Sequence, residues 1–397
     1  MNKIYMDHIA GNPVSEEVMD AMLPYLKDVY GNPQSMHLFG EEAKEAIEEA
    51  RGKVAELINA KPGEIYFTSS GTESNNFALK GIVPAYAKKG KHIIISAVEH
   101  QSVLYSAKAL EKTGCSVSYV PVDKYGVVNP EDVLKAVRPE TVLVSVMYAN
   151  SEVGSIQPVA EIAKAVREKG IIFHTDAVAA AGNIPVDVEA DGVDSLSMSA
   201  SQFYGPKGAG ALYIRKGTRV IPFLDGGIQE EGRRAGTENI PGIAGMGKAA
   251  ELAKREMYNR SARLKVLRDT LLKQLPEKID RIYPTGHPEK RLPNHASFCV
   301  EFIEGEAMLL NLSMEGIAVS SGSACTSRAL KSSHVLKAMG VDDAVAQGSV
   351  VMSMGISNTG DDIRRLLEVF PPIVDKLRKM SPLYTKHLNA QKRGGDK

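Results

Sequence analysis

The sequence predicts an α/β protein built on a mostly parallel β-sheet that helices cover on both faces. Short runs rich in Ile and Val alternate along the chain with amphipathic helical stretches. The runs are almost continuously apolar, which is typical of strands that are buried on both faces. The chain has 397 residues, enough for a large core and for two or more domains.

Six runs are the candidate strands of this sheet. In chain order they are EIYFTSS from Glu64, HIIIS from His92, SVSYVPV from Ser116, TVLVSVMYAN from Thr141, IIFHTDA from Ile171 and GALYIR from Gly210. Helical stretches separate them, as a parallel sheet requires. The clearest is residues 40–60, where the following apolar residues share one face: Ala43, Ile47, Val54, Leu57 and Ile58.

The rest of the chain predicts a second, smaller unit. A helical pattern over residues 243–275 has no proline and is long enough to connect the two units. The segments HASFCVEFI, GIAVSSG and VVMSMGI then predict a small sheet. Residues 361–380 predict a final helix, interrupted at Pro371-Pro372 because proline lacks an amide N–H. We expect the tail NAQKRGGDK to fray.

Composition excludes several classes of function. Lys plus Arg and Asp plus Glu both number 48, so no positive excess indicates nucleic-acid binding. No apolar run approaches the roughly 20 residues of a membrane span, and the first residues lack a signal-peptide pattern, so we expect a cytoplasmic protein without a membrane partner. The three cysteines, Cys115, Cys299 and Cys325, indicate neither a disulfide framework nor a self-contained metal site.

Three stretches carry candidate site residues. In FTSSGTESNN a strand leads through a turn at Thr72 into a helix, whose N-terminus would suit a phosphate; the alternative is a plain turn with Thr72 as the cap. His100 follows a strand and could stack on an aromatic cofactor, although a hydrogen-bonded histidine at a strand end is the better local interpretation. Asp176 ends a strand, where it could pair with a protonated ring nitrogen or cap the next helix.

Longer stretches resemble one family in order across both units. They are FTSSGTESNN, ISAVEH, LVSVMYANSEVGSIQPV, FHTDA, FYGPKGAGALYIRKG, GTENIPGIAGMGKA, AVSSGSACTS and MSPLY. The chain resembles a cysteine desulfurase of the NifS/IscS class. This resemblance implies the fold-type-I pyridoxal-phosphate-dependent transferase fold, with a mostly parallel seven-stranded sheet in a large domain and a smaller α/β domain. We expect the large domain at residues 15–258 and the small one at 259–397, completed by residues 1–14.

The resemblance also implies roles for individual residues. Thr72 and Ser199 would hold the cofactor phosphate. His100 would stack on the ring, Asp176 would pair with the ring nitrogen, and Asn150 would lie near the ring hydroxyl.

The resemblance also implies roles for Thr237 and Cys325. Thr237 would reach into the pocket of a second subunit, which implies a homodimer. Cys325, in the loop SSGSACTSRALKSS, would take sulfur from free cysteine and carry it as a persulfide. A thiol among such polar neighbours can also ligate iron. An inert, buried Cys325 fits these neighbours poorly, whereas Cys115 and Cys299 lie in apolar runs typical of a core.

The chain departs from the family pattern in the pocket. Gln202 stands where the family has the Schiff-base lysine, and Lys207 does not replace it because the family has a lysine there as well. Four other departures each remove size or polarity: Ser201 for a histidine, Ala179 for a glutamine, and Val351 and Ile356 for two arginines, the first of which binds the substrate carboxylate. A neutral amide neither forms an imine nor acts as a base at neutral pH.

These departures favour one of two hypotheses. In the first, the protein has lost pyridoxal-phosphate-dependent desulfuration, the cofactor is absent or non-covalent, and the homodimer docks an iron–sulfur scaffold protein of the IscU type. Cys325 would then be a cluster ligand or a sulfur relay. In the second, the protein is an active desulfurase that binds pyridoxal phosphate without a lysine. The first is preferred because the arginine that clamps the substrate is missing too.

Overall fold

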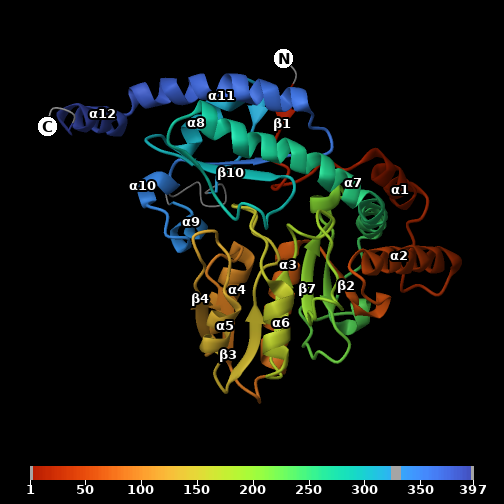
Figure 1. Cartoon of the computed structure of the whole chain (residues 1–397). Coiled ribbons are helices and arrows are strands. Elements are labelled where there is room, and N and C mark those ends of the chain that lie inside the picture. The colour runs from red at the N-terminus through yellow and green to blue at the C-terminus, as the bar shows by residue number, and fades with distance from the viewer. Residues whose placement is uncertain (1–2, 323–331, 395–397) are drawn as a thin grey trace.

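The computed structural model describes residues 3–322 and 332–394 and shows two sheets with their own helices (Figure 1). The larger sheet has seven strands in the order β2-β8-β7-β6-β5-β3-β4. Their bounds are β2 Ile65–Thr68, β3 His92–Ser96, β4 Ser116–Val120, β5 Thr141–Ser145, β6 Ile172–Asp176, β7 Ser195–Ser199 and β8 Gly210–Ile214. β8 runs antiparallel to both of its neighbours, and the other pairings are parallel. The predicted mostly parallel, seven-stranded sheet is therefore confirmed.

Helices cover both faces of this sheet. On one face lie α3 (Gly71–Ala85) and α4 (Gln101–Glu111), packed in one core cluster with Ile93 and Ile95. Ile94, between them, belongs to the core on the opposite face. The helices that contribute to this second core are α1 Glu16–Lys27, α2 Leu38–Leu57, α5 Pro130–Ala136, α6 Val159–Arg167 and the first part of α7 Ile240–Lys278. Successive residues of a strand point to opposite faces, so both must be apolar, as the sequence indicates.

The smaller sheet has three strands in the order β12-β10-β9, all antiparallel. Their bounds are β9 Ile282–Pro284, β10 His295–Val300 and β12 Ser349–Ser353. The sequence predicted residues 316–322 as part of this small sheet, and this is only partly right, because the segment touches it through a single antiparallel bridge from Ser320 to Val351 of β12. That segment forms the short strand β11 (Ile317–Ala318), which pairs in parallel with β1 (Ile4–Tyr5) as a separate ribbon. A period-two pattern identifies a strand but not its partner.

Helices of the second half pack on the smaller sheet. The later turns of α7 join α8 (Gly305–Met314) and α11 (Gly360–Met380) in one core with Phe298 and Met352. Met6 lies in the same core, so the first residues of the chain pack with the C-terminal half. The division at residue 258 stays a prediction, and it falls inside α7, which runs continuously between the two cores (Figure 1). The remaining short helices are α9 His334–Ala338 and α10 Asp343–Ala346.

α11 corrects a second prediction, because it continues through Pro371 and Pro372 instead of being interrupted there. Each proline removes one N–H from the helix ladder, which costs stability. The helix nevertheless buries an apolar face on both sides of the prolines, and that packing outweighs the missing hydrogen bonds. α12 (Pro382–Gly394) then extends beyond the body of the molecule (Figure 1). The first part of the predicted frayed tail is therefore helical.

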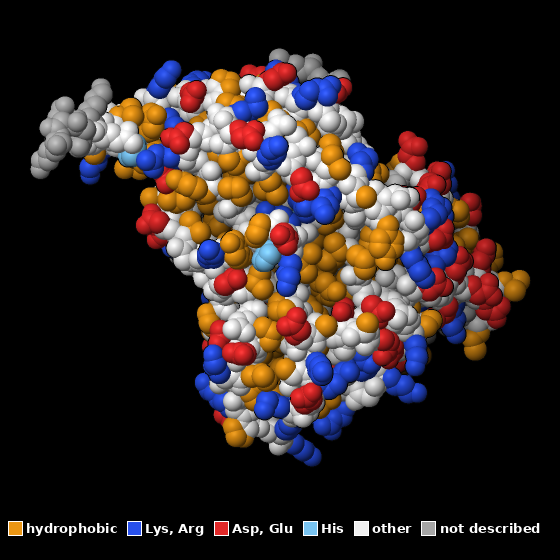
Figure 2. Space-filling model, viewed as in Figure 1, with side chains coloured by type: hydrophobic (Ala, Val, Ile, Leu, Met, Phe, Trp, Pro, Cys, Tyr) orange, Lys and Arg blue, Asp and Glu red, His pale blue; other side chains and the backbone are white. Residues whose placement is uncertain are grey.

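The surface carries both signs of charge in similar amounts. Lys and Arg side chains are interspersed with Asp and Glu side chains over the face shown in Figure 2. This agrees with the formal net charge of zero. Within the described residues, no helix combines the length and the apolar character that crossing a bilayer would need.

Candidate functional site

A cavity of about 400 Å³ lies at the carboxyl end of the parallel strands of the larger sheet. Open α/β sheets bind their ligands at this edge. The walls come from the start of α3, the loops after β3 and β5, the ends of β6 and β7, and residues of the smaller sheet. Six of the predicted site residues line the cavity together: Thr72, His100, Asn150, Asp176, Ser199 and Gln202. Thr237 is exposed and does not line it, and Cys325 lies outside the described residues.

Asp176 is the last residue of β6 and is 5% exposed. Its Oδ2 accepts a hydrogen bond from Asn75 Nδ2 at 2.6 Å, and its Oδ1 accepts one from the amide of Val178 at 3.0 Å. Burial raises the pKa of Asp176, and the nearby His100 partly offsets this rise. Burial is the larger of the two effects, so the protonated form of this carboxyl is favoured relative to a solvent-exposed aspartate.

Asn75 and Ser102 connect Asp176 to His100. Asn75 Nδ2 also donates to Ser102 Oγ at 2.8 Å, and that hydroxyl lies 2.7 Å from His100 Nδ1. His100 is the N-cap of α4 and accepts from the amide of Ser102 at 3.2 Å. The imidazole is thus a hydrogen-bonded helix cap that also lines the cavity, and its stacking on a cofactor stays a prediction.

Small polar groups form the wall near the start of α3. Ser70 caps this helix by accepting from the amide of Glu73 at 3.2 Å. A Cβ at Gly71 would come within 2.4 Å of Val178, so only glycine allows this close approach. Ser199 Oγ lies 3.1 Å from Ser201 Oγ. A helix N-terminus flanked by hydroxyls is a fitting environment for an anion.

Gln202 lies in the short 3-10 helix Ala200–Phe203 and is 6% exposed. Its Nε2 donates to the carbonyl of Ile9 at 3.0 Å. The main-chain carbonyl of Gln202 accepts from the side chains of Asn12 at 3.0 Å and Asn183 at 3.4 Å, bonds that do not depend on the glutamine side chain. The amide thus holds the N-terminal segment against the cavity. Lys207 donates to the carbonyl of Asn12 at 3.3 Å and does not line the cavity.

The other departures from the family pattern lie around the same space. Val351 on β12 is 3% exposed and lines the cavity, as does Ala179. Ile356 is 45% exposed and does not line the cavity. Its backbone amide donates to Tyr204 Oη at 2.9 Å. No Lys or Arg occurs among the described residues of the cavity wall. Among these described residues, pyridoxal phosphate finds no amine for covalent attachment and a substrate carboxylate finds no guanidinium.

Asn150 lines the cavity, and both ends of its side-chain amide hold a loop. Its Nδ2 donates to the carbonyl of Val98 at 3.0 Å, and its Oδ1 accepts from the amides of Glu152 at 2.8 Å and Val153 at 3.0 Å. These bonds fix the loop that follows β5. Its predicted position near a cofactor hydroxyl stays a prediction.

Two glutamates of the cavity wall, the buried Glu99 and the half-buried Glu152, were not among the predicted site residues. Glu99 accepts from Ser96 Oγ at 2.6 Å and from the amide of Met147 at 2.8 Å, and burial raises its pKa to about 8. Glu152 accepts from Ser333 Oγ, and burial raises its pKa to about 7. Both line the cavity. A charged residue directly after an apolar strand was the available signal for Glu99.

The described residues on either side of the Cys325 segment also line the cavity. They are Ser320, Ser321 and Gly322 before it and Ser333, His334 and Val335 after it. Glu152 contacts both sides, because it accepts from Ser333 and a Cβ at Gly322 would lie 2.9 Å from its Oε2. Among the residues that the structure describes, no cluster of three or more His, Cys, Asp or Glu side chains is arranged to hold a metal ion.

Comparisons with known proteins cover nearly the whole chain. The family model "Aminotransferase class-V" matches residues 4–366. A protein of Dictyoglomus turgidum named "Cysteine desulfurase IscS" is 50% identical over 380 residues, covering 96% of each chain. One of the same name from Methanosarcina thermophila is 51% identical over 383 residues, covering 96% of this chain and 95% of that protein. A solved "NifS-like protein" aligns with a TM-score of 0.89 at 39% identity, covering 95% of this chain and 100% of that one.

Proposed function

Because this chain belongs to the class-V aminotransferase family and, within it, to the cysteine desulfurases of fold type I, we propose that it serves iron–sulfur cluster assembly without desulfurating cysteine itself. In this proposal the chain forms a homodimer and docks a scaffold protein of the IscU type. Cys325 acts there as a ligand of the nascent cluster or as a relay for sulfur produced elsewhere.

The observation that carries the proposal is Gln202. An amide cannot attach pyridoxal phosphate covalently, and it cannot accept a proton at neutral pH. Its hydrogen bond to the carbonyl of Ile9 gives this side chain a structural part in the fold instead. Val351 supports the same conclusion, since an aliphatic group cannot replace an arginine that binds a carboxylate.

A second function keeps some support from the same cavity. Thr72, Ser199, His100 and Asp176 all line it, and these are the residues that would hold the phosphate and the ring. Pyridoxal phosphate bound without a covalent link would supply electron withdrawal for an active desulfurase. The chain offers no cation for the substrate carboxylate among the described wall residues, which disfavours this second function.

The retained thiol gives the proposal its chemistry. Cys325 lies in VSSGSACTS, a polar stretch that agrees with the family pattern without a gap. The described residues that flank this segment in the sequence line the cavity, which supports a role for the thiol there. A thiolate is both a good sulfur acceptor and a soft ligand for iron. Cys299, in contrast, is 1% exposed, and burial raises the pKa of its thiol to about 12.

Cys325→Ser tests this proposal directly. Serine keeps the size and polarity of the side chain but forms no persulfide and is a poor ligand for iron. The variant should keep the fold and the dimer. It should lose the contribution to cluster formation when scaffold protein and iron are combined with sulfide, which tests the ligand role, or with a small-molecule persulfide that transfers its outer sulfur and leaves as a thiolate, which tests the relay role. Cluster yield is followed by visible absorbance, and the complex by size exclusion.

Cys299→Ser is the matched control. It places a hydroxyl in an apolar core and should lower the free energy of unfolding by about 1–3 kcal/mol, while cluster yield stays that of the parent. Equal cluster yields from Cys325→Ser and the parent would contradict the proposal.

A further inference from the structure

The loops that precede the parallel strands of the larger sheet meet at its amino edge, opposite the cavity. β6, β5, β3 and β4 are consecutive in the sheet and parallel, so the loops before them lie side by side although they are far apart in the sequence. Exposed cations gather in these loops: Lys88, Lys89, Lys91, Lys112, Arg138 and Lys169. Figure 2 shows Lys and Arg side chains at the lower end of the molecule, which lies away from the smaller sheet in Figure 1.

Hydrogen bonds join these loops into one surface around the loop before β3. The carbonyl of Lys91 accepts from the first amide of β4 at 2.9 Å, and the carbonyl of Glu140 accepts from the first amide of β3 at 3.0 Å. The side chain of Lys89 donates to the carbonyl of Gly170 in the loop before β6. The six cations therefore belong to one continuous surface, which we call the basic edge.

The basic edge carries more positive charge than its own carboxylates balance. Within the residues that the structure describes, none of its six cations forms an ion pair; the ion pairs nearby are those of Arg167 with Asp194 and of Arg215 with Glu189. The same loops expose three carboxylates, those of Glu111, Glu140 and Glu168. The formal net charge of the whole chain is zero, so this excess is local. A local excess of one sign attracts and orients a partner of the opposite sign.

The side chains of the basic edge discriminate among polyanions. Five of its six cations are lysines, whereas the planar guanidinium of arginine is the usual group for binding phosphates. These loops, all of which the structure describes, expose no large apolar side chain that could insert into a bilayer. The neighbouring ring of Tyr86 is covered by Arg219, whose guanidinium lies 4.8 Å from the ring centroid, so it offers no platform for a nucleic-acid base.

We propose that the basic edge docks an acidic polypeptide, a Glu- or Asp-rich segment of another protein. The three interspersed glutamates fit this partner, because a polypeptide can place neutral residues opposite them, whereas nucleic acid and anionic lipid carry charge throughout. Four adjacent strands about 4.8 Å apart span about 15 Å, which an extended segment of about five residues covers. The basic edge and the cavity lie at opposite edges of the sheet, so the docking does not rest on the part assigned to Cys325.

Fluorescence anisotropy of the full chain with a labelled peptide of about ten residues, in which Glu alternates with Ser, tests the proposal. The peptide should bind, and its affinity should fall at least about tenfold between about 0.05 M and about 0.5 M salt, because salt screens exposed charges. The same peptide with Gln in place of Glu should bind at least about tenfold more weakly. No binding of the Glu peptide, or equal affinities for the two peptides, would overturn the proposal.

Competition against the labelled peptide distinguishes the other polyanions. Unlabelled Glu peptide should displace it at a lower concentration of negative charge than duplex DNA does, or than vesicles of phosphatidylcholine and phosphatidylserine do. More effective displacement by the duplex or by the vesicles would overturn the choice of a polypeptide.

Charge reversal locates the binding surface. Lys88→Glu/Lys89→Glu/Lys91→Glu changes the central loop of the basic edge and should weaken the Glu peptide by about tenfold or more. If this variant does not fold, Lys112→Gln/Lys169→Gln decides the question in the neighbouring loops, with a smaller loss of affinity in the same direction. Parental affinity in a folded variant would overturn the proposal.

A matched control separates the basic edge from the charge of the whole chain. Lys265→Glu/Lys273→Glu/Lys379→Glu changes the net charge by the same amount at exposed positions of α7 and α11, which pack on the smaller sheet (Figure 1). This variant should bind the Glu peptide as the parent does, and a loss equal to that of the basic-edge variant would overturn the proposal. Cys325→Ser should also bind like the parent, so the outcome is independent of the cluster experiment.

Discussion

Gln202→Lys should restore covalent attachment of pyridoxal phosphate without restoring efficient cysteine desulfuration. The new amine would stand beside Thr72, Asp176, His100 and Ser199, which line the same cavity. The substitution removes the hydrogen bond of 3.0 Å to the carbonyl of Ile9. Losing that bond should lower the free energy of unfolding by about 1–2 kcal/mol, which a folded chain of this size tolerates.

The remaining defect is at Val351. A charged hydrogen-bonded clamp contributes about 2–3 kcal/mol, and each 1.4 kcal/mol is about tenfold in rate. Gln202→Lys alone should therefore have a kcat/KM about a hundredfold below that of Gln202→Lys/Val351→Arg. Gln202→Lys/Val351→Leu, which adds volume without charge, should remain as slow as the single variant.

Two assays check this prediction. Borohydride reduction followed by peptide mass mapping should find the cofactor on residue 202 of the variant, with Lys207 as the internal control. Sulfide release from L-cysteine then gives kcat/KM. The reasoning is refuted if the single variant already produces sulfide as fast as the double variant, because Val351 would then not limit the reaction.

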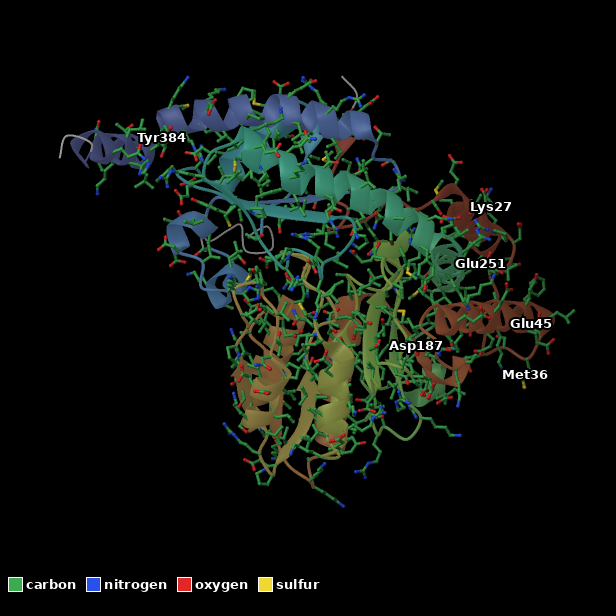
Figure 3. The ribbon with its side chains drawn as sticks, viewed as in Figure 1. Lys27, Met36, Glu45, Asp187, Glu251 and Tyr384 are labelled. Atoms are coloured by element: carbon green, nitrogen blue, oxygen red, sulfur yellow. The ribbon has the colours of Figure 1, made fainter. Side chains whose placement is uncertain are left out.

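The remaining predictions concern pH and assembly. The pKa of Glu99 is raised from 4.5 to about 8 by burial, so its contribution to stability is present at acidic pH and is lost as pH rises through that value. Between pH 5 and 8 this group should lower the free energy of unfolding by about 3 kcal/mol. In urea titrations at several pH values, Glu99→Gln should remove that part of the fall. The same pH profile in the variant and the parent would contradict the raised pKa of Glu99. The chain should sediment as a dimer at micromolar concentration, and a stable monomer would contradict this. Thr237 is exposed outside the cavity of its own chain. Two large apolar side chains are exposed as well, Leu38 at 80% and Met36 at 99%, and Met36 projects from the outer edge of the molecule (Figure 3).

Much of the fold could be predicted from local patterns. Continuous apolar strands, such as His92–Ser96, indicated a sheet covered on both faces, and the structure has one. β7 was missed because the alternating serines of SLSMS are typical of a loop. Two of these serines are hydrogen-bonded in the structure, Ser197 to His174 and Ser199 to Ser201. The pairing of β11 with β1 joins residues more than 300 positions apart, which no local pattern reveals.

The sequence predicted several of the residues that meet at the site, but not their pKa values or hydrogen bonds. The positions of Thr72, His100 and Asp176 around one cavity follow from strands whose carboxyl ends meet at one edge. Ser199 could be named only from the family resemblance, because its strand β7 was not predicted. The state of Glu99 could not be predicted, because its raised pKa arises from burial by segments distant in sequence. The structural hydrogen bond of Gln202 to Ile9 likewise needs the folded N-terminal segment.

The central proposal is that this cavity does not attach pyridoxal phosphate covalently. The most direct test is the near-ultraviolet and visible spectrum of the purified parent protein after incubation with excess pyridoxal phosphate and gel filtration. We predict that no covalently held chromophore remains with the protein, because Gln202 offers no amine. A chromophore retained at one per chain, whose spectrum changes when L-cysteine is added, would contradict the claim.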